Sequence, residues 1–231
     1  SLYKDYIGRD VTQDEGVTVL AESSAGKQWN VESIIAFQPD LVICSTAMSG
    51  HATISPPAGA AQIPVIAVAY NDFSDYLKWF KVFCNLTGHP ELWESVALKS
   101  LDDVLATIAL APTENNLNVL CLFNSPKDLR VNTDLTLTGA MIKQLNGKNI
   151  VDKWENASGA DRLPLNLEAA FDGDPDMILV QCHGDLKKVK EQIEAAVGGS
   201  PVWQALRAVK EEKVFLLDPH LFHYKPNSKF A

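Results

Sequence analysis

The stretch Asn30-Val-Glu-Ser-Ile-Ile-Ala-Phe-Gln-Pro-Asp-Leu-Val-Ile-Cys44 decides the fold. Asn30 is a favourable helix N-cap, and Pro39 marks the end of the helix that begins behind it. The apolar run from Leu41 to Cys44 has the composition of a strand that is buried on both faces. The stretch therefore predicts a capped helix, a Pro-Asp turn and a buried strand.

The same pattern occurs a second time. Asn166-Leu-Glu168 leads to Pro175-Asp176 and then to the apolar run that begins at Met177. Asn166 and Pro175 follow their counterparts in the first copy by the same 136 residues. Two copies of one helix–turn–strand pattern predict two similar α/β units in the chain.

Further apolar, β-branched runs alternate with helical patterns, which is typical of α/β proteins with mostly parallel sheets. The predicted strands are Val17–Leu20, Leu41–Cys44, Val65–Ala69, Val119–Phe123, Met177–Gln181 and Val214–Leu217. The predicted helices around them are Val31–Phe37, Thr138–Leu145, Leu186–Val197 and Trp203–Val209.

The longest helical pattern runs from Pro90 to Leu110, between the two copies. Its apolar positions, Trp93, Ala97, Leu101, Val104 and Ile108, form one stripe at helical spacing. A helix of this length spans about 30 Å, enough to join two lobes, although an ordinary core helix has the same periodicity. We expect an N-terminal lobe over 1–89, an interdomain helix over 90–111 and a C-terminal lobe over 112–231. The fold class is therefore α/β, with two Rossmann-like lobes joined by a single long backbone helix.

Composition excludes several functions. Of the 231 residues, 46% are hydrophobic, and 29 acidic against 20 basic residues give a net charge of −9. This balance argues against binding to nucleic acid or to an anionic membrane surface, both of which require clustered positive charge. The four cysteines have no metal-binding spacing, and most lie in apolar runs, so we expect buried free thiols.

The sequence lacks the usual catalytic motifs, including G-x-S-x-G, H-E-x-x-H, a complete P-loop and G-x-G-x-x-G. We therefore expect no enzyme, no cofactor and no metal centre, although a cytoplasmic α/β enzyme remains an alternative. Ligands of open α/β sheets bind at the carboxyl ends of the strands. The candidate ligand contacts at predicted strand ends are Ser45, Thr46, Met48, Tyr70, Asn124, Arg130, His183, His220 and Tyr224.

Charged and metal-binding side chains at these ends are few. Arg130 and Lys127 are the basic exceptions near the strand ends, which argues mildly against a strongly anionic ligand. His220 and His223 offer a weak metal-binding pattern, since their spacing is common and no third ligand accompanies them. A metal-sensing or metallochaperone protein is a further alternative.

The stretch Val31–Ile43 resembles a hallmark of the class III periplasmic binding proteins, the substrate-binding subunits of iron-siderophore, haem and cobalamin ABC importers. Further stretches resemble this family in the same order, and the similarity as a whole covers roughly residues 17–230. They are Ile63-Pro-Val-Ile-Ala-Val68, Leu86-Thr-Gly88 and Pro201-Val-Trp-Gln-Ala-Leu-Arg-Ala-Val-Lys-Glu-Glu-Lys-Val-Phe215.

The resemblance implies an extracytoplasmic, monomeric protein that holds an iron complex in a cleft between its lobes and delivers it to a membrane permease. Cobalamin or an oxyanion such as molybdate is the nearest alternative ligand. The family's acidic docking residues suggest Asp185 or Glu191 in the C-terminal lobe, whereas the loop after Cys44 carries no carboxylate. The family usually has a further strand and helix before this starting point, and a helix beyond Ala231, so we expect an incomplete first lobe. We expect a location in the periplasm or, as a lipoprotein, on the cell surface, with the signal segment not present in this chain.

Overall fold

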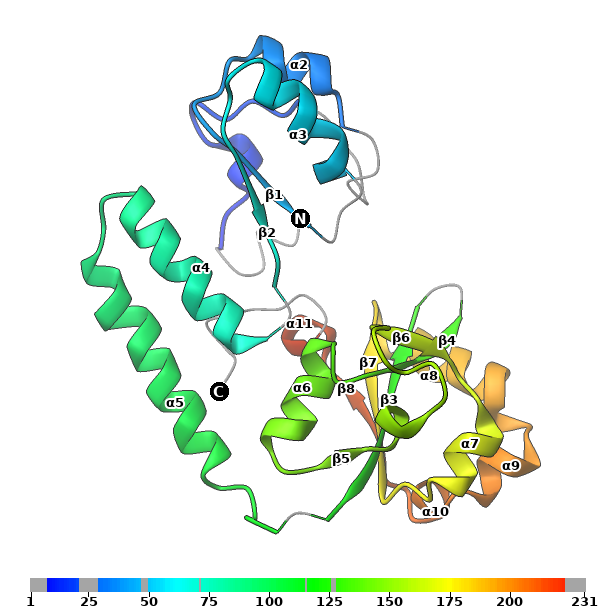
Figure 1. Ribbon diagram of the computed structural model, residues 1–231. Helices are drawn as coiled ribbons and strands as arrows, with labels where there is room; N and C mark the ends of the chain where they lie inside the picture. Colours follow the sequence, from blue (N-terminus) through cyan, green and yellow to red (C-terminus); the bar gives the residue numbers. More distant parts are fainter. Residues whose placement is uncertain are drawn as a thin grey trace. The chain divides into compact units, whose positions relative to one another are not determined.

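The computed structural model describes residues 8–20, 29–46, 50–70, 72–114, 116–125 and 128–222. The chain divides into two compact units, Ser1–Tyr70 and Asn71–Ala231, which we call unit 1 and unit 2 (Figure 1). No helix in the described ranges is long and apolar enough to cross a membrane.

Unit 1 is built on a small parallel sheet. Strands β1 (Val42–Ser45) and β2 (Val65–Val68) pair with Val42 opposite Val65. Helices α2 (Val31–Ala36) and α3 (Gly50–Ala60) supply the apolar side chains that pack on it, and a short 3-10 turn, η1, covers Val11–Gln13. Ile54 on α3 is fully buried in this core.

The strand predicted at Val17–Leu20 is wrong. These residues have no regular secondary structure, and the side chains of Val17 and Val19 are 48% and 49% exposed. An apolar run forms a strand only where a neighbouring strand accepts its hydrogen bonds, and the described part of unit 1 provides none for this run.

Unit 2 contains a larger mixed sheet in the order β6-β4-β3-β7-β8, with β5 also paired to β3. Strands β3, β5, β7 and β8 pair in parallel, whereas β4 is antiparallel to both β3 and β6. The strands are β3 (Asn118–Asn124), β4 (Leu129–Asn132), β5 (Lys148–Asn149), β6 (Arg162–Pro164), β7 (Met177–Cys182) and β8 (Val214–Leu217).

Helices cover both faces of this sheet. On one face, Ile142 of α6 packs against Val119 and Cys121, and on the other, helices α7 to α10 close the larger core around Leu120 and Leu122 (Figure 1). The helices are α6 (Leu137–Gln144), η3 (Ile150–Lys153), α7 (Leu167–Asp172), α8 (Leu186–Ile193), η4 (Glu194–Gly198), α9 (Pro201–Ala205), α10 (Arg207–Lys210) and α11 (Pro219–Phe222).

The predicted helix Trp203–Val209 forms two short helices instead of one. Leu206, between α9 and α10, has an extended ψ of 134° and is 1% exposed. Because the helix breaks at Leu206, the side chain of this residue packs into the larger core of unit 2.

The long helical pattern is confirmed as helix. A π-helical segment, η2 (Trp93–Leu98), continues directly into α5 (Lys99–Ile108). On its predicted stripe, Ala97 and Val104 are 0% and 5% exposed. Its role as a bridge between lobes stays a prediction.

Helix α4 (Phe73–Leu86) precedes the long helix and was not predicted. Asp72 caps it by accepting a hydrogen bond from the amide of Asp75, and Phe73, Tyr76 and Cys84 are buried. Because α4 contacts η2, it belongs to unit 2, and the contact division falls after Tyr70. The lobe boundary expected at residue 89 stays a prediction.

The structure confirms the internal repeat. Asn30 caps α2 by accepting from the amide of Ser33, and Asn166 caps α7 by accepting from the amide of Ala169, both at 3.0 Å. The turns that follow carry left-handed residues at matching positions, Gln38 at φ 49° and Asp174 at φ 40°. The two copies therefore agree in their caps and in the backbone of the turn.

Candidate functional site

The predicted contacts of unit 1 lie together at the carboxyl end of its sheet. Ser45 pairs with Val68 in the strand register. The amide and the hydroxyl of Thr46 both donate to the carbonyl oxygen of Val68, at 3.0 and 3.3 Å. Tyr70 follows two residues later and is half-buried. Met48 lies outside the described residues.

The corresponding edge of unit 2 brings together residues from three strands. Asn124 ends β3 and pairs with Cys182 at the end of β7, so His183 comes directly after the pair. Arg130 on β4 lies opposite Phe123. His220 lies on α11, just after β8, and its amide donates to the carboxylate of Asp218 at 2.8 Å. His183, Arg130 and His220 are exposed, whereas Tyr224 lies outside the described residues.

Asn124 points toward helix α8. Its side-chain nitrogen donates to the Oε1 of Gln192 at 3.1 Å, and the residue is 3% exposed. Asn124 and Gln192 both line a hollow of about 290 Å³ at this end of β3. Part of the hydrogen-bonding capacity of Asn124 is therefore used within the protein.

Helix α8 carries both predicted docking carboxylates. Asp185 is its N-cap and accepts a hydrogen bond from the amide of Lys188 at 3.1 Å. Glu191 lies further along the helix, and both residues are exposed. Both carboxylates are therefore accessible from the surface.

Sequence analysis missed Arg162, which opens β6. Its Nε donates to the Oδ1 of Asn132 at 2.9 Å, and its guanidinium carbon lies 4.1 Å from the centre of the Phe123 ring. The register places Arg162 opposite Asn132 and places Arg130 opposite Pro164, so the two arginines are diagonal neighbours on adjacent strands. Nothing in the sequence indicated this arrangement, because it depends on the pairing of β6 with β4. The paired residues Arg162 and Asn132 are 30 residues apart in the chain.

A chain of buried amides holds Arg162 in place. The side chain of Asn132 donates to the Oε1 of Gln181 at 2.7 Å, and Gln181 donates to the carbonyl oxygen of Phe222 at 2.8 Å. Asn149 in turn donates to the carbonyl oxygen of Asn132 at 2.8 Å. Because each amide both donates and accepts, its orientation is fixed by its neighbours.

The four cysteines are buried and free, as predicted. Burial raises the pKa of Cys121 to about 12 and that of Cys182 to about 11. Because a thiol reacts and binds metals as the thiolate, burial makes Cys121 and Cys182 weak nucleophiles and weak metal ligands. Among the residues that the structure describes, no three His, Cys, Asp or Glu side chains gather as a potential metal site.

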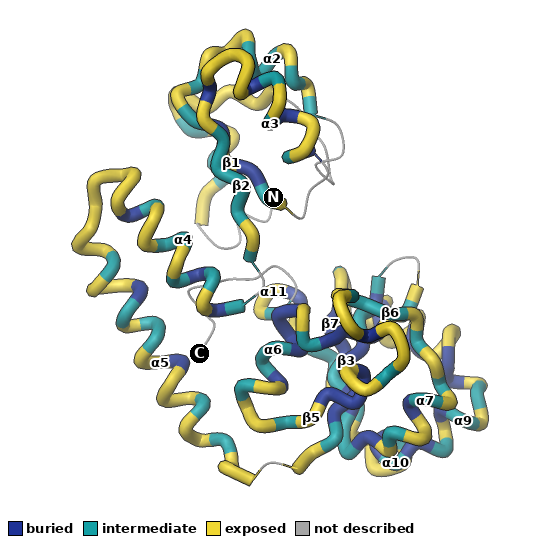
Figure 2. The backbone as a smooth tube through the Cα atoms, viewed as in Figure 1, coloured by how far each residue is buried: buried dark blue, intermediate teal, exposed yellow. Residues whose placement is uncertain are grey.

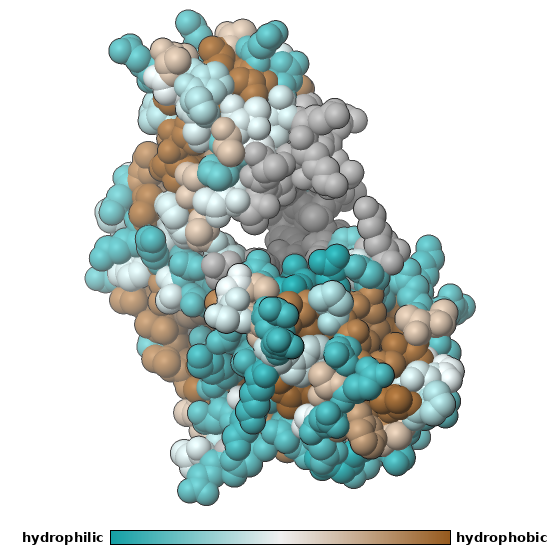
Figure 3. Space-filling view, turned by 45° about the vertical axis from the view of Figure 1, so that its right-hand side comes forward, coloured by the Kyte–Doolittle hydropathy of each residue, from teal (hydrophilic) through white to brown (hydrophobic). Residues whose placement is uncertain are grey.

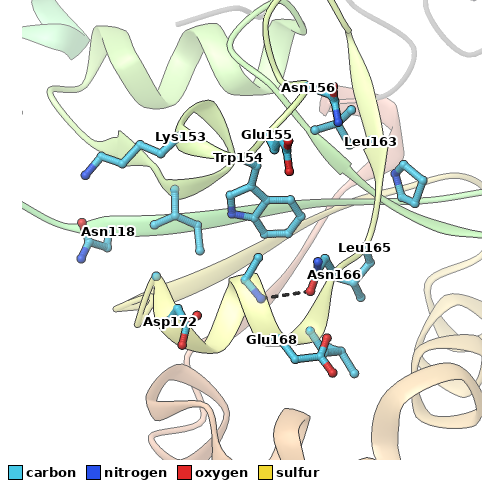
Figure 4. A pocket seen from close by; sticks show the side chains of 15 residues that line it. Asn118, Lys153, Trp154, Glu155, Asn156, Leu163, Leu165, Asn166, Glu168 and Asp172 are labelled. Atoms are coloured by element: carbon cyan, nitrogen blue, oxygen red, sulfur yellow. Dashed lines mark hydrogen bonds between the residues drawn. The ribbon is translucent and has the colours of Figure 1, made fainter.

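A larger hollow of unit 2 lies elsewhere. It measures about 1170 Å³ and is lined by η3, α7 and the segment between β6 and α7, with the indole of Trp154 at its centre (Figure 4). It reaches Asn118, which opens β3, and therefore lies away from the carboxyl ends of the strands. Its charged lining residues are Lys153, Glu155, Glu168 and Asp172.

The fold and these strand ends define a class. Each unit is α/β and carries polar side chains at the carboxyl ends of its parallel strands, the arrangement typical of α/β ligand-binding proteins. A family model described as periplasmic binding protein matches residues 5–221. The chain belongs to this family.

Similar proteins agree with the assignment. The high-affinity heme uptake system protein IsdE of Staphylococcus aureus is 27% identical over 100 residues, 43% of this chain and 33% of its own length. An ABC transporter substrate-binding protein from Listeria monocytogenes superimposes with a TM-score of 0.68 at 20% identity, covering 87% of this chain and 76% of that one. FeuA of Bacillus subtilis, solved with ferri-bacillibactin, superimposes with a TM-score of 0.66 at 20% identity, covering 87% and 70%.

The chain covers about a third of the length of the curated relatives that it matches. The matching structures share its fold at identities of 20%. The α/β architecture is thus confirmed.

Proposed function

We propose that the chain is the substrate-binding protein of an ABC importer, which binds an iron complex of the siderophore or haem type outside the cytoplasm and delivers it to the permease. The observation that carries this proposal is the family match over residues 5–221. The named relatives support the choice of ligand, since IsdE belongs to heme uptake and FeuA was solved with a ferric siderophore.

Such a function requires complementary binding and no bond chemistry. Polar groups at strand ends stand on a rigid scaffold, which limits the entropy lost when a ligand binds. The proposed contacts are Ser45, Thr46, Met48 and Tyr70 of unit 1, and Asn124, Arg130, His183, His220 and Tyr224 of unit 2. Of the described members, Thr46, Arg130, His183 and His220 are exposed in this structure.

Docking to the permease is proposed to use helix α8. Asp185 and Glu191 are both exposed on it, so they can reach basic side chains of a membrane subunit. We expect the protein to act as a monomer in this step.

Tryptophan fluorescence provides the test, because the chain contains five tryptophans. The full-length mature protein is titrated with haem, ferric catecholate and hydroxamate siderophores, cobalamin and molybdate. The iron-free siderophores serve as controls. Saturable quenching at submicromolar concentration by one iron complex, with stoichiometry of one, is the expected result.

Two other results would change the proposal. Binding of cobalamin or molybdate alone would keep the binding-protein class but replace the ligand. The absence of saturable quenching with every compound of the panel would refute the iron-complex proposal.

A further inference from the structure

Arg162 is a partly buried cation that makes one polar contact within the described part of the chain. No carboxylate oxygen among the described residues lies within 4.0 Å of its guanidinium, and its only polar contact there is Asn132. Asp161, its neighbour in sequence, acts on it only at longer range. Burial and, less strongly, the like charge of Arg130 lower the pKa of Arg162. A partly buried charge is costly unless an opposite charge accompanies it.

The other arginines of unit 2 show the contrast. Arg207 forms ion pairs with Asp174 and Asp176, and Arg130 forms one with Asp128 at 2.7 Å. Arg130 and Arg162 together therefore hold one excess positive charge on one face of the sheet, in a chain whose net charge is −9.

The contacts of Arg162 leave its terminal nitrogens available. Asn132 occupies Nε, and the ring of Phe123 covers the guanidinium plane. The terminal Nη1 and Nη2 make no hydrogen bond with the described residues. These two nitrogens form a planar fork that matches the two oxygens of a carboxylate.

The amide chain through Asn132 and Gln181 fixes the fork before any ligand arrives. A fixed donor pair loses less entropy on binding than a flexible surface side chain does. A structural role alone would not explain why the described residues offer no acceptor to the charged end of Arg162.

We propose that Arg162, with Arg130 beside it, binds an ionised carboxylate of the substrate, so that the transported iron complex carries at least one free carboxylate. The inference rests on the proposed function and narrows its ligand class. It runs against the expectation from sequence that the scarcity of basic groups near the strand ends argues mildly against a strongly anionic ligand. The carboxylate has two chemical sources, the propionates of haem and the carboxylates of a citrate-type siderophore.

The test compares Arg162→Gln and Arg162→Lys with wild type in the fluorescence titration. Lys210→Gln is the control, since it removes the same charge from an exposed position on α10. The probes are haem, haem dimethyl ester, a ferric citrate-type siderophore and ferrichrome, a neutral hydroxamate complex.

We expect Arg162→Gln to weaken binding of the carboxylate-bearing complex about 30-fold and Arg162→Lys about fivefold, as loss of a charge-assisted bidentate pair predicts. Lys210→Gln should change it less than twofold. Whether haem or the citrate-type siderophore binds wild type tightly identifies the source of the carboxylate. If the source is haem, haem dimethyl ester should bind wild type as weakly as haem binds Arg162→Gln. The melting temperature of the ligand-free Arg162→Gln protein should be unchanged or higher.

Two results would overturn the inference while leaving the proposed function intact. One is tight binding of an iron complex that Arg162→Gln does not affect. The other is a fall in melting temperature together with equal weakening for neutral and carboxylate-bearing complexes, which would assign Arg162 a structural role.

A separate readout covers the case in which wild type binds no iron complex, so that the proposed function fails. The side-chain nitrogen resonances of Arg162 are then followed by NMR during titration with tricarballylate, an iron-free tricarboxylate, and with its neutral triamide. A shift with the acid and none with the amide supports the carboxylate site. The absence of a shift with either refutes it.

Discussion

The two copies of the helix–turn–strand pattern share their local structure but differ in their surroundings. Both copies have an asparagine cap and a left-handed residue before Pro-Asp. In unit 2, strand β7 lies between β3 and β8, whereas in unit 1 the equivalent strand β1 pairs only with β2 among the described residues. Figure 2 shows the consequence, since buried residues concentrate in the strands of unit 2.

The difference shows that the local sequence determines the helix–turn–strand pattern. The neighbouring strands and helices determine how far the residues of its strand are buried. Ile43 and Leu179 occupy the same place in the two copies. Ile43 is 50% exposed, whereas Leu179 packs against the cluster of Val119, Cys121 and Ile142. Figure 3 shows that hydrophobic surface, coloured brown, is present on the face that it draws.

The largest expected effect separates the cores of the two units. Ile178 on β7 is fully buried, and Ile178→Ala should lower the free energy of unfolding of unit 2 by about 3 kcal/mol. Ile43→Ala removes the same atoms from a half-exposed position and should cost unit 1 less than about 1 kcal/mol. Hydrogen–deuterium exchange, read separately on amides of each unit, provides the measurement. Equal losses would mean that the sheet of unit 1 is as enclosed as that of unit 2.

A second difference concerns the aspartate of the Pro-Asp turn. In unit 2, the Asp176 carboxylate accepts from the amide of Asn118 at 2.7 Å and pairs with Arg207 at 2.6 Å. Asp40, its counterpart in unit 1, is exposed, and its carboxylate makes no hydrogen bond or ion pair with the described residues. Asp176→Ala should therefore destabilise unit 2 by about 2 kcal/mol, and Asp40→Ala should change unit 1 by less than about 0.5 kcal/mol.

The Asp176 contribution also depends on pH. Burial acts to raise the pKa of Asp176, but the hydrogen bond from Asn118 and the charge of Arg207 outweigh it and hold the pKa below its ordinary value. The stabilisation is therefore complete above the pKa of an unfolded aspartate, about 3.9, and is lost as the pH falls through the lower folded value. The free energies of unfolding of wild type and Asp176→Ala, measured as the pH is lowered, should therefore converge below the folded pKa of Asp176. A constant difference down to the lowest pH would contradict this assignment.

Sequence alone predicted the strands and helices whose signals are local. The caps at Asn30 and Asn166 and the buried runs that follow them are examples. Helix α4 also has a local signal, since Phe73, Tyr76 and Cys84 recur at helical spacing behind the Asp72 cap, although it was not predicted. The prediction for Val17–Leu20 failed because a strand requires a partner, a condition that hydrophobic periodicity does not report.

The candidate site was predictable only as a set of strand ends. Sequence placed His183 and Arg130 near strand ends, and the structure has both at the edge of the unit 2 sheet where β3 and β7 end. The environment of Arg162 was not predicted, because Asn132, Phe123 and Gln181 come from three different strands. The direction of Asn124 toward Gln192 likewise depends on which face of β3 meets α8.

The smallest expected effect tests the turn itself. Gln38 and Asp174 both have positive φ, a conformation that costs a residue with a side chain about 1 kcal/mol and costs glycine nothing. Gln38→Gly should therefore stabilise unit 1 by about 0.5 kcal/mol, after the greater flexibility of glycine in the unfolded chain is subtracted.

Asp174→Gly should bring no such gain in unit 2. Aspartate tolerates the left-handed conformation better than glutamine does, and the Asp174 carboxylate pairs with Arg207 at 3.1 Å. Relief of backbone strain and loss of a mostly exposed ion pair then nearly cancel. Hydrogen exchange of α2 and α7 measures both variants. If both glycines stabilise their units equally, the ion pair contributes nothing, and if neither does, the shared turn is unstrained in both copies.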